Sequence, residues 1–338
     1  GTAEDVVKAN LWLRTADKIL IVLNRFKAMT FEDLFQGVNS IKWENLMPEN
    51  AKFVVTGKSF KSQLSSVPAC QSISEKAVIK AMQRKYKIAH FPKDGDEYTI
   101  QVALLKDIVT VTLNTSGPSL HKRGVQQVMA PLKETMAAAL IMLSYWKPDR
   151  VLLDPCCGSG TIAIEAALIA KNIAPGLMRH FAAEKWDFID KELWKKERRE
   201  ARLAIKQDFQ PKIYGSDINA NAVKMSMENA DNAGVGDCIK FAQIPFNKLK
   251  LPCNYGVCIS NPPYAERMGN LNDVERLYRD MGKLFNHNKT WSTYFITSHE
   301  GFEKLYGRRA DKKRKLFNGN VKTDYYQFYG ERPPKKKQ

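Results

Sequence analysis

A strand–turn–helix stretch near the middle of the chain places the strongest constraint on its fold. Residues 151–161 read VLLDPCCGSGT, an apolar run that ends at Asp154 and a turn that contains Gly158 and Gly160. The run 162–170 that follows has the composition of a helix. A glycine turn between a strand and a helix brings backbone N–H groups close to a ligand. Two glycines alone are weak evidence, so the stretch predicts a ligand site only if other features support it.

Two further polar motifs provide that support. Residues 216–219 read SDIN at the end of a second expected strand, and residues 260–264 read SNPPY after another. The three motifs together resemble those of S-adenosylmethionine-dependent methyltransferases with a doubly wound fold. The Asn-Pro-Pro-Tyr form resembles the enzymes that methylate exocyclic amines of nucleobases.

The chain is most similar to one family, the bacterial RNA methyltransferases that carry a THUMP domain in front of the catalytic domain. These are related to the 23S rRNA guanine-N2 methyltransferases and are often labelled N6-adenine-specific DNA methylases. The resemblance covers nearly the whole chain, and it is carried by residues 9–15, 120–124, 130–135, 154–161 and 260–264.

The resemblance implies an α/β fold in two domains. A Rossmann-like class I methyltransferase domain is expected over 118–332 and a basic tail over 333–338. A small α+β THUMP-type RNA-binding domain, with a remnant of an N-terminal small domain, is expected over 1–117, because Ser116-Gly117-Pro118 marks a break. The chain begins Gly1-Thr2, and relatives carry a strand-containing segment before this point, so we expect the numbering to start inside the native protein.

Hydrophobic periodicity predicts the elements. In the front domain, helices are expected over 4–14, 31–39 and 68–86, and strands over 18–26, 51–57, 98–104 and 108–113. In the second domain, helices are expected over 131–146, 162–170, 186–209, 220–233 and 276–285, and strands up to 154 and over 213–217, 239–242, 256–260, 291–297 and 324–329.

The net charge of +17 and the pI near 9.5 favour a polyanionic partner, and nucleic acid is the first candidate. The resemblance implies that this nucleic acid is RNA, with rRNA as the expected kind. In the front domain the candidate RNA-facing residues are Lys58, Lys61, Lys76, Lys80, Arg84, Lys85 and Lys87. A second basic group lies on the expected helix 186–209 and comprises Lys195, Lys196, Arg198, Arg199, Arg202 and Lys206. Residues 308–315 form a further basic cluster. For each residue a solvated surface is the simpler interpretation, so only the ensemble argues for phosphate contact.

Composition also excludes several classes. No apolar run is long enough to span a bilayer, and no secretory signal opens the chain. The six cysteines include no CxxC pair, which predicts reduced thiols in a cytoplasmic protein and no metal site.

The resemblance implies S-adenosylmethionine as the cofactor. Asp217 is expected to accept the ribose hydroxyls, and Asp154 to bind the amino group of the methionine part, directly or through water. Relatives often carry an acid after the third strand to hold the adenine, but this chain has Gln243-Ile244-Pro245-Phe246, so Gln243 or a backbone group is expected there. The full expected cofactor set is Asp154, Cys156, Gly158, Ser159, Gly160, Thr161, Asp217, Ile218 and Gln243.

Three residues near the start of the second domain have open roles. Lys133 and Thr135 are expected either to touch the cofactor or only to cap a helix that opens at Pro131. His121 is expected to serve as a hinge or phosphate neighbour rather than in proton transfer.

The catalytic residues are expected to be Asn261, Pro262 and Tyr264. An aromatic exocyclic amine is a poor nucleophile because its lone pair is delocalised. Asn261 Oδ1 and the Pro262 carbonyl can accept its two N–H groups and hold the nitrogen in line with the methyl group, while Tyr264 stacks on a base that has left its stack.

Guanine N2 in 23S rRNA is the expected target, on the strength of the resemblance. Adenine N6 in DNA or RNA, and guanine N2 in tRNA, remain alternatives, because the motif alone indicates only an exocyclic amine. An RNA-binding protein with a vestigial cofactor fold is the alternative from another class. Covalent pyrimidine C5 methylation is disfavoured, because Pro155-Cys156 lies in the cofactor loop and the acceptor turn has no cysteine.

Overall fold

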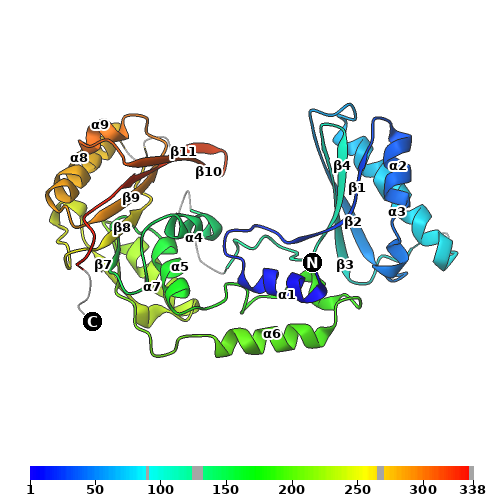
Figure 1. Ribbon diagram of the computed structural model, residues 1–338, viewed down its shortest axis with the longest axis horizontal. Helices are drawn as coiled ribbons and strands as arrows, with labels where there is room; N and C mark the ends of the chain where they lie inside the picture. The colour runs from blue at the N-terminus through cyan, green and yellow to red at the C-terminus, as the bar shows by residue number, and fades with distance from the viewer. Residues whose placement is uncertain (89–90, 124–131, 265–269, 335–338) are drawn as a thin grey trace. The chain divides into compact units, whose positions relative to one another are not determined.

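The computed structural model describes residues 1–88, 91–123, 132–264 and 270–334 (Figure 1). The chain forms two compact units, each with its own sheet. The first unit comprises 1–120 together with 176–202, and the second comprises 121–175 together with 203–338. The sequence predicts two contiguous ranges with a break at 117, so the structure differs in assigning 118–120 and 176–202 to the first unit.

The first unit is built on a four-stranded sheet in the order β1-β4-β3-β2. The strands are β1 (Leu20–Lys27), β2 (Lys52–Phe60), β3 (Glu97–Leu105) and β4 (Ile108–Asn114). β2 runs parallel to β3, and the other pairs are antiparallel. Lys106 and Asp107 join β3 to β4 with φ values of 51° and 63°, the two positive φ angles of a type I′ hairpin turn.

The helices of this unit bury apolar side chains against the sheet. They are α1 (Ala3–Trp12), α2 (Phe31–Asn39) and α3 (Val67–Tyr86). The side chain of Thr30 accepts a hydrogen bond from the Asp33 backbone and the Asp33 carboxylate accepts one from the Thr30 backbone, so a capping box starts α2. Alternate residues of β3 are buried, which gives the sheet one core face and one more open face.

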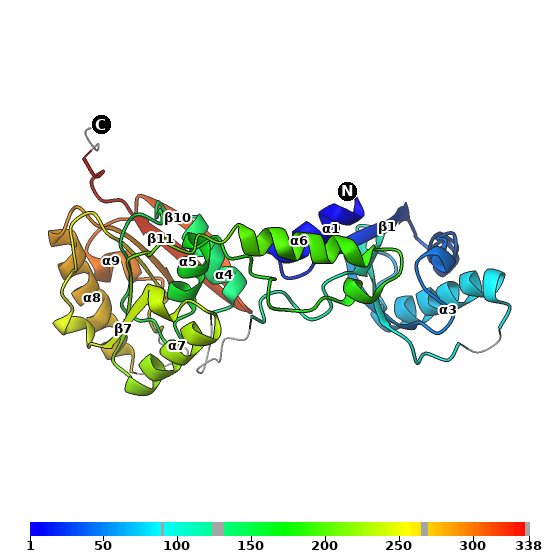
Figure 2. The same ribbon diagram turned by 90° about the horizontal axis from the view of Figure 1, so that it is seen from below.

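The segment 176–202 completes the core of the first unit. Trp186 is fully buried and stacks on Tyr98 with ring centroids 5.0 Å apart. Helix α6 (Lys191–Leu203) is shorter than the predicted helix 186–209, and it lies beside α1, where Lys196 Nζ is 3.5 Å from Glu4 Oε1 (Figure 2). Arg198 donates to the carbonyls of Leu177 and Arg179 and pairs with Glu184. At least these two of its basic residues therefore have structural partners within this unit.

The cationic residues of the front domain divide in a similar way. Arg84 donates to the Asn39 carbonyl at 2.8 Å, and Lys85 to the Glu44 carbonyl at 3.3 Å. Lys76 and Lys80 are exposed and line a groove between α2 and α3. Their expected contact with RNA stays a prediction.

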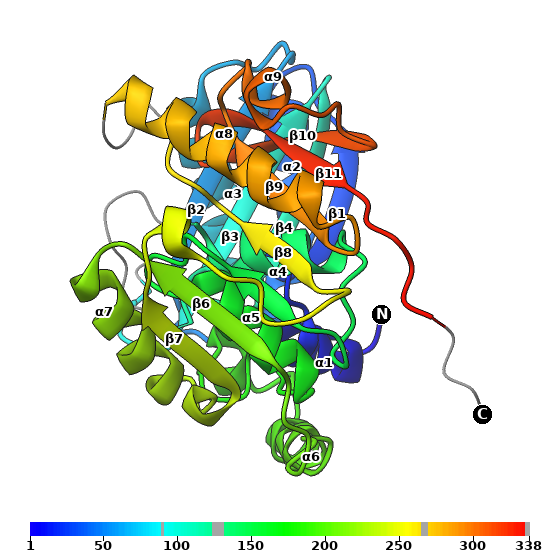
Figure 3. The same cartoon turned by 90° about the vertical axis from the view of Figure 1, so that its left-hand side faces the viewer.

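The second unit is built on a seven-stranded sheet in the order β10-β11-β9-β8-β5-β6-β7 (Figure 3). The strands are β5 (Leu152–Asp154), β6 (Ile213–Asp217), β7 (Ile239–Gln243), β8 (Val257–Ser260), β9 (Ser292–Thr297), β10 (Lys312–Asn318) and β11 (Val321–Phe328). β5 to β9 are mutually parallel, and β11 and β10 are antiparallel additions at one edge. The expected basic cluster 308–315 thus runs into a strand, β10.

Helices cover both faces of this sheet. α4 (Glu134–Met142), α5 (Thr161–Ala170) and α7 (Ala220–Asn232) contribute to one apolar cluster, and α8 (Leu271–His287) and α9 (Phe302–Tyr306) to another. This arrangement confirms the expected Rossmann-like domain, which follows the THUMP-type domain in the sequence. The expected start of a helix at Pro131 lies outside the described residues, as does most of the tail 333–338. Among the described helices, none combines the length and apolarity that a bilayer crossing requires.

Candidate active site

A pocket of about 760 Å³ opens at the carboxyl ends of β5, β6 and β8. The order of the sheet reverses at β5, which pairs with β6 on one side and with β8 on the other. In open α/β sheets, ligands bind where the strand order reverses. The three sequence motifs follow these three strands, so the fold brings them to one place.

The glycine turn has a backbone that only glycine adopts easily. Gly158 and Gly160 have φ values of 53° and 82°, in the left-handed region. A Cβ atom on Gly160 would lie 2.9 Å from Ser226 Cβ and 3.0 Å from Phe241 Cζ. Gly160 therefore serves close packing of the turn against α7 and β7, and it is absent from the pocket lining, whereas Gly158 lies in it.

Asp217 ties the glycine turn to β6. Its Oδ2 accepts the Gly158 N–H at 3.0 Å, and its Oδ1 accepts the Asn219 N–H at 2.9 Å. The Cys157 N–H also donates to the Ser216 carbonyl at 2.9 Å. The carboxylate at the strand end thus fixes the loop, and it lines the pocket beside Ile218, whose side chain is 70 % exposed.

Asp154 is a buried carboxyl group at the base of the pocket. It is 1 % exposed, and its Oδ1 accepts hydrogen bonds from Ser260 Oγ at 2.6 Å and from the Cys156 N–H at 3.3 Å. Burial raises the pKa of Asp154 to about 7, which the Ser260 and Cys156 hydrogen bonds oppose and the Asp217 charge reinforces. A cation bound beside this buried carboxyl group would stabilise its ionised form.

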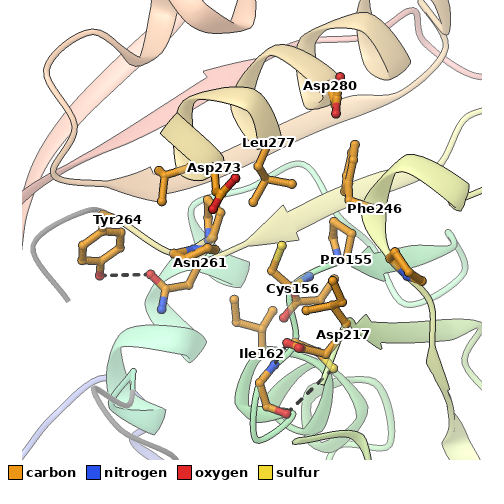
Figure 4. Close-up of a pocket in the computed structure, with 18 of the residues that line it drawn as sticks. Pro155, Cys156, Ile162, Asp217, Phe246, Asn261, Tyr264, Asp273, Leu277 and Asp280 are labelled. Carbon is orange, nitrogen blue, oxygen red and sulfur yellow. Dashed lines mark hydrogen bonds between the residues drawn. The ribbon is translucent and has the colours of Figure 1, made fainter. Parts of the chain in front are cut away.

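The acceptor turn, Asn261-Pro262-Pro263-Tyr264, is held by hydrogen bonds from two later parts of the chain. Tyr264 is 4 % exposed, and its hydroxyl group donates to Asn261 Oδ1 at 3.1 Å (Figure 4). Asn318 Nδ2, on β10, donates to the Tyr264 hydroxyl at 3.0 Å, and the buried Tyr278 hydroxyl, on α8, donates to the Pro263 carbonyl at 2.9 Å. The side chain of Asn261 is therefore oriented before any ligand arrives.

The structure brings most of the predicted site residues into one pocket. Its lining includes Asp154, Cys156, Gly158, Ser159, Thr161, Asp217, Ile218, Asn261, Pro262 and Tyr264. Gln243 is not in the lining: its Nε2 donates to the Ile218 carbonyl at 3.0 Å, so it supports the loop, and its expected contact with adenine stays a prediction. Lys133 and Thr135 are also absent from the lining, while Leu132 is present.

The sequence motifs do not mark the apolar part of the pocket. Phe246 and Leu277 line it, together with Val274 and Pro245. Figure 4 shows Phe246 and Leu277 on the side of the pocket formed by the loop after β7 and by α8. Ile218 and Phe246 both line the pocket but lie 28 residues apart in the sequence, so no local motif joins them and only the fold shows that they share a site.

The pocket thiols are poor nucleophiles. Burial raises the pKa of Cys156, and the negative charges of Asp154 and Asp217 raise it further; the pKa of Cys157 is raised for the same reasons. A neutral thiol in this position does not attack a pyrimidine ring. The six cysteines are unpaired, and the described residues include no group of side chains suited to a metal ion.

The residues present fit S-adenosylmethionine. The pocket has a volume of about 760 Å³, within the usual range for sites that bury a drug-sized ligand. It offers a carboxylate at the end of β6 for a ribose diol, an apolar wall for a ring, and a buried carboxyl group, Asp154, for a positive charge. The fold and the site together define a class I S-adenosylmethionine-dependent methyltransferase.

Comparison with known proteins identifies the family. Residues 122–327 match the model for the RMKL-like methyltransferase domain, and residues 28–114 match the THUMP domain. The chain belongs to this RMKL-like methyltransferase family and carries a THUMP domain in front of the catalytic domain. S-adenosylmethionine is its cofactor.

The relatives match nearly the whole of this chain. A Bacillus subtilis protein named "Putative RNA methyltransferase YpsC" is 49% identical over 342 residues, which covers 100% of this chain and 89% of that protein. A Psychromonas ingrahamii protein named ribosomal RNA large subunit methyltransferase K/L is 33% identical over 332 residues, but this chain spans only 44% of its length. The crystal structure of SMU.472 complexed with SAH has a TM-score of 0.93 and 46% identity, covering 99% of this chain and 89% of that one.

Proposed function

We propose that this protein transfers a methyl group from S-adenosylmethionine to the exocyclic N2 of a guanine in RNA, with 23S rRNA as the substrate. The observation that carries the proposal is the pre-oriented Asn261 side chain in the same pocket as Asp154 and Asp217. RNA is supported by the THUMP domain, by the net charge of +17 and by the names of the relatives. Such an enzyme works where ribosomes are assembled, in the cytoplasm.

The cofactor supplies a methyl group on a positively charged sulfur atom. We expect the Asp217 carboxylate to accept hydrogen bonds from the ribose hydroxyls and the Asp154 carboxylate to stabilise the ammonium group. Asp217 already accepts hydrogen bonds from the backbone N–H groups of Gly158 and Asn219. These bonds hold the glycine turn and the Asp217 carboxylate in a fixed relative position before the cofactor binds.

Asn261 Oδ1 and the Pro262 carbonyl would accept the two N–H groups of the target amine and place its lone pair toward the methyl group. The amine is acidic once methylated, so a strongly basic side chain is not needed and positioning supplies most of the acceleration. Tyr264 acts on Asn261 through its hydroxyl group, since its ring is buried in this structure. Stacking of Tyr264 on the target base stays a prediction.

Adenine N6, in DNA or RNA, is the second candidate. The Asn-Pro-Pro-Tyr turn favours it equally, because that turn recognises an amine and not a particular ring. Methylation assays with labelled cofactor on rRNA, tRNA and duplex DNA, followed by nucleoside analysis, separate the candidates. N2-methylguanosine from rRNA supports the proposal, and N6-methyladenine overturns it in favour of the second candidate.

Two variants test the role of Asn261 itself. Asn261→Ala is expected to abolish turnover while the calorimetric affinity for S-adenosylmethionine stays near that of the wild type. Asn261→Asp keeps an accepting oxygen at the same position and is the matched control, expected to retain part of the turnover. Full turnover by Asn261→Ala would remove the acceptor role.

A further inference from the structure

The tip of the β10–β11 hairpin lies at the carboxyl ends of the parallel strands, where the active site opens. β11 is antiparallel to β9, and Asp324 pairs with Thr297, the last residue of β9. Residues 318–321 therefore extend beyond the carboxyl end of β9, and the Asn318–Tyr264 hydrogen bond of 3.0 Å anchors this tip to the acceptor turn. The tip is thus a neighbour of the site in space.

One face of the tip carries an exposed aromatic ring between two lysines. Phe317 is 63 % exposed, and it pairs in register with Lys322 across the hairpin. Lys315 lies two residues from Phe317 on the same strand, so all three side chains point to the same face. These three residues are called the hairpin-tip surface below.

The opposite face of the tip has the normal character of a protein interior. Leu316 is half-buried, and Asn318 and Thr323 are buried. Leu316 packs against an apolar cluster of the second unit, and Asn318 donates to the Tyr264 hydroxyl. The Thr323 hydroxyl donates to the Leu316 carbonyl, so these contacts hold the inner face in place. Phe317 belongs to none of the apolar clusters that the described residues form, so the packing of the core does not explain an aromatic residue at this position.

The hairpin-tip surface carries more positive than negative charge, although Asp324 stands opposite Lys315 in the hairpin register. Further along β10, Lys313 is 3.5 Å from Asp324 and lies over the Tyr326 ring. Within the part of the chain that the structure describes, Lys315 and Lys322 form no ion pair, and both are exposed. Asp324 pairs with Lys313, so one carboxylate stands against the three lysines of this face and the net charge beside the exposed aromatic ring is positive. A positive surface with an exposed ring suits a single-stranded nucleic acid, whose bases stack and whose phosphates are anionic.

A lone exposed apolar residue is ordinary on a protein surface. Here three features coincide: the aromatic ring, the two flanking cations, and an anchor one residue away that leads through Tyr264 to Asn261. We propose that the hairpin-tip surface binds single-stranded RNA next to the methylated nucleotide, with Phe317 stacking on a flanking base and Lys315 and Lys322 contacting phosphates. This inference rests on the proposed RNA substrate and deepens it.

The variants of the full-length chain isolate each contact. Phe317→Ala removes the ring, and Phe317→Trp keeps a stacking surface. Lys315→Glu combined with Lys322→Glu reverses both charges. The matched control is Lys289→Glu, because Lys289 is exposed and precedes β9, at the amino ends of the parallel strands and so away from the carboxyl ends where the active site opens.

Two quantities are measured first. They are the KM for rRNA in methyl transfer and the affinity for a short fluorescein-labelled oligouridine, which is followed by fluorescence anisotropy. We expect Phe317→Ala to weaken both about tenfold, as the loss of one stacked base does, and Phe317→Trp to restore them. The double charge reversal should reduce the slope of log affinity against log salt concentration by about 1.4, which is roughly 0.7 for each of the two lost phosphate contacts. Lys289→Glu should change neither, and S-adenosylmethionine affinity should be unchanged in every variant.

The second measurement is photocrosslinking of a 4-thiouridine-containing oligoribonucleotide, with the crosslinked peptide identified by mass spectrometry. A crosslink within residues 315–322 supports the proposal. Methyl transfer to RNA with an unchanged KM in all hairpin variants, and no crosslink there, overturns it while the proposed function stands. A crosslink at the hairpin without any methyl transfer to RNA would instead contradict the proposed function and leave the surface assigned.

Discussion

Asp154→Asn should make the protein without cofactor more stable and unable to bind its cofactor well. The pKa of Asp154 is raised from an ordinary value of 3.8 to about 7 because the carboxyl group is buried. Between about pH 4 and pH 7 the Asp154 carboxyl group is therefore protonated in the folded protein and ionised in the unfolded chain. Below about pH 4 the group is protonated in both states and costs nothing. As the pH rises toward 7 the unfolded state is favoured, and above 7 the full cost is present.

The size of the effect follows from the shift. A rise from 3.8 to about 7 corresponds to about 4 kcal/mol at pH 8, since one pKa unit is worth about 1.4 kcal/mol. At pH 5 the cost has only begun to develop and is about 2 kcal/mol. Asn keeps an oxygen for the Ser260 hydroxyl and carries no charge, so the substitution removes this cost.

The assay is denaturant unfolding of wild type and Asp154→Asn at pH 5 and pH 8 without cofactor. The variant should gain stability at both values and about 2 kcal/mol more at pH 8 than at pH 5. Asp149→Asn, an exposed carboxyl group before β5, is the control and should show no such difference. Calorimetry in buffers of different ionisation heat should show proton release when S-adenosylmethionine binds the wild type. An equal gain at both pH values, or a loss at pH 8, would refute the reasoning.

Three further substitutions test the site. Asp217→Ala should weaken S-adenosylmethionine binding by at least tenfold in calorimetry, because each hydrogen bond to a carboxylate is worth about 1.5–3 kcal/mol; unchanged affinity would refute the ribose assignment. Tyr264→Phe deletes the hydroxyl group that joins Asn261 to Asn318, so kcat should fall about tenfold with cofactor affinity intact, and an unaltered kcat would show that Asn261 needs no such support. Gly160→Ala adds a Cβ at φ 82°, 2.9 Å from another Cβ, and should destabilise the protein by about 2 kcal/mol or more in denaturant unfolding; a neutral result would mean the turn can move.

The sequence predicted the parts of the site that follow strands. The strand 213–217 has the expected bounds, and Asp154, Asp217 and Asn261 all line one pocket. These residues can be predicted from the sequence because a polar residue directly after an apolar run is a local pattern. The expected roles of Asn261 and Asp217 remain predictions that the variants above test.

The residues that the sequence could not predict act over long separations. Asn318 lies 54 residues after Tyr264, and Tyr278 lies 15 residues after Pro263, so neither belongs to a motif. A basic helix was predicted over 186–209, and the structure has a helix over 191–203, but the sequence pattern does not say which core such a helix packs against. Only the folded structure shows that it belongs to the first unit.

The return of residues 176–202 to the first unit sets an order on synthesis at the ribosome. Trp186 and Trp194 occupy the interior of that unit, yet they are translated about 70 to 80 residues after its last strand, β4, ends at Asn114. At elongation rates of about 5–20 residues per second, the nascent first unit waits roughly 4–16 s with a gap in its interior. During that interval the Tyr98 ring lacks the Trp186 indole that covers it in the folded protein, so an apolar surface of the first unit stays exposed until residues 176–202 have been made.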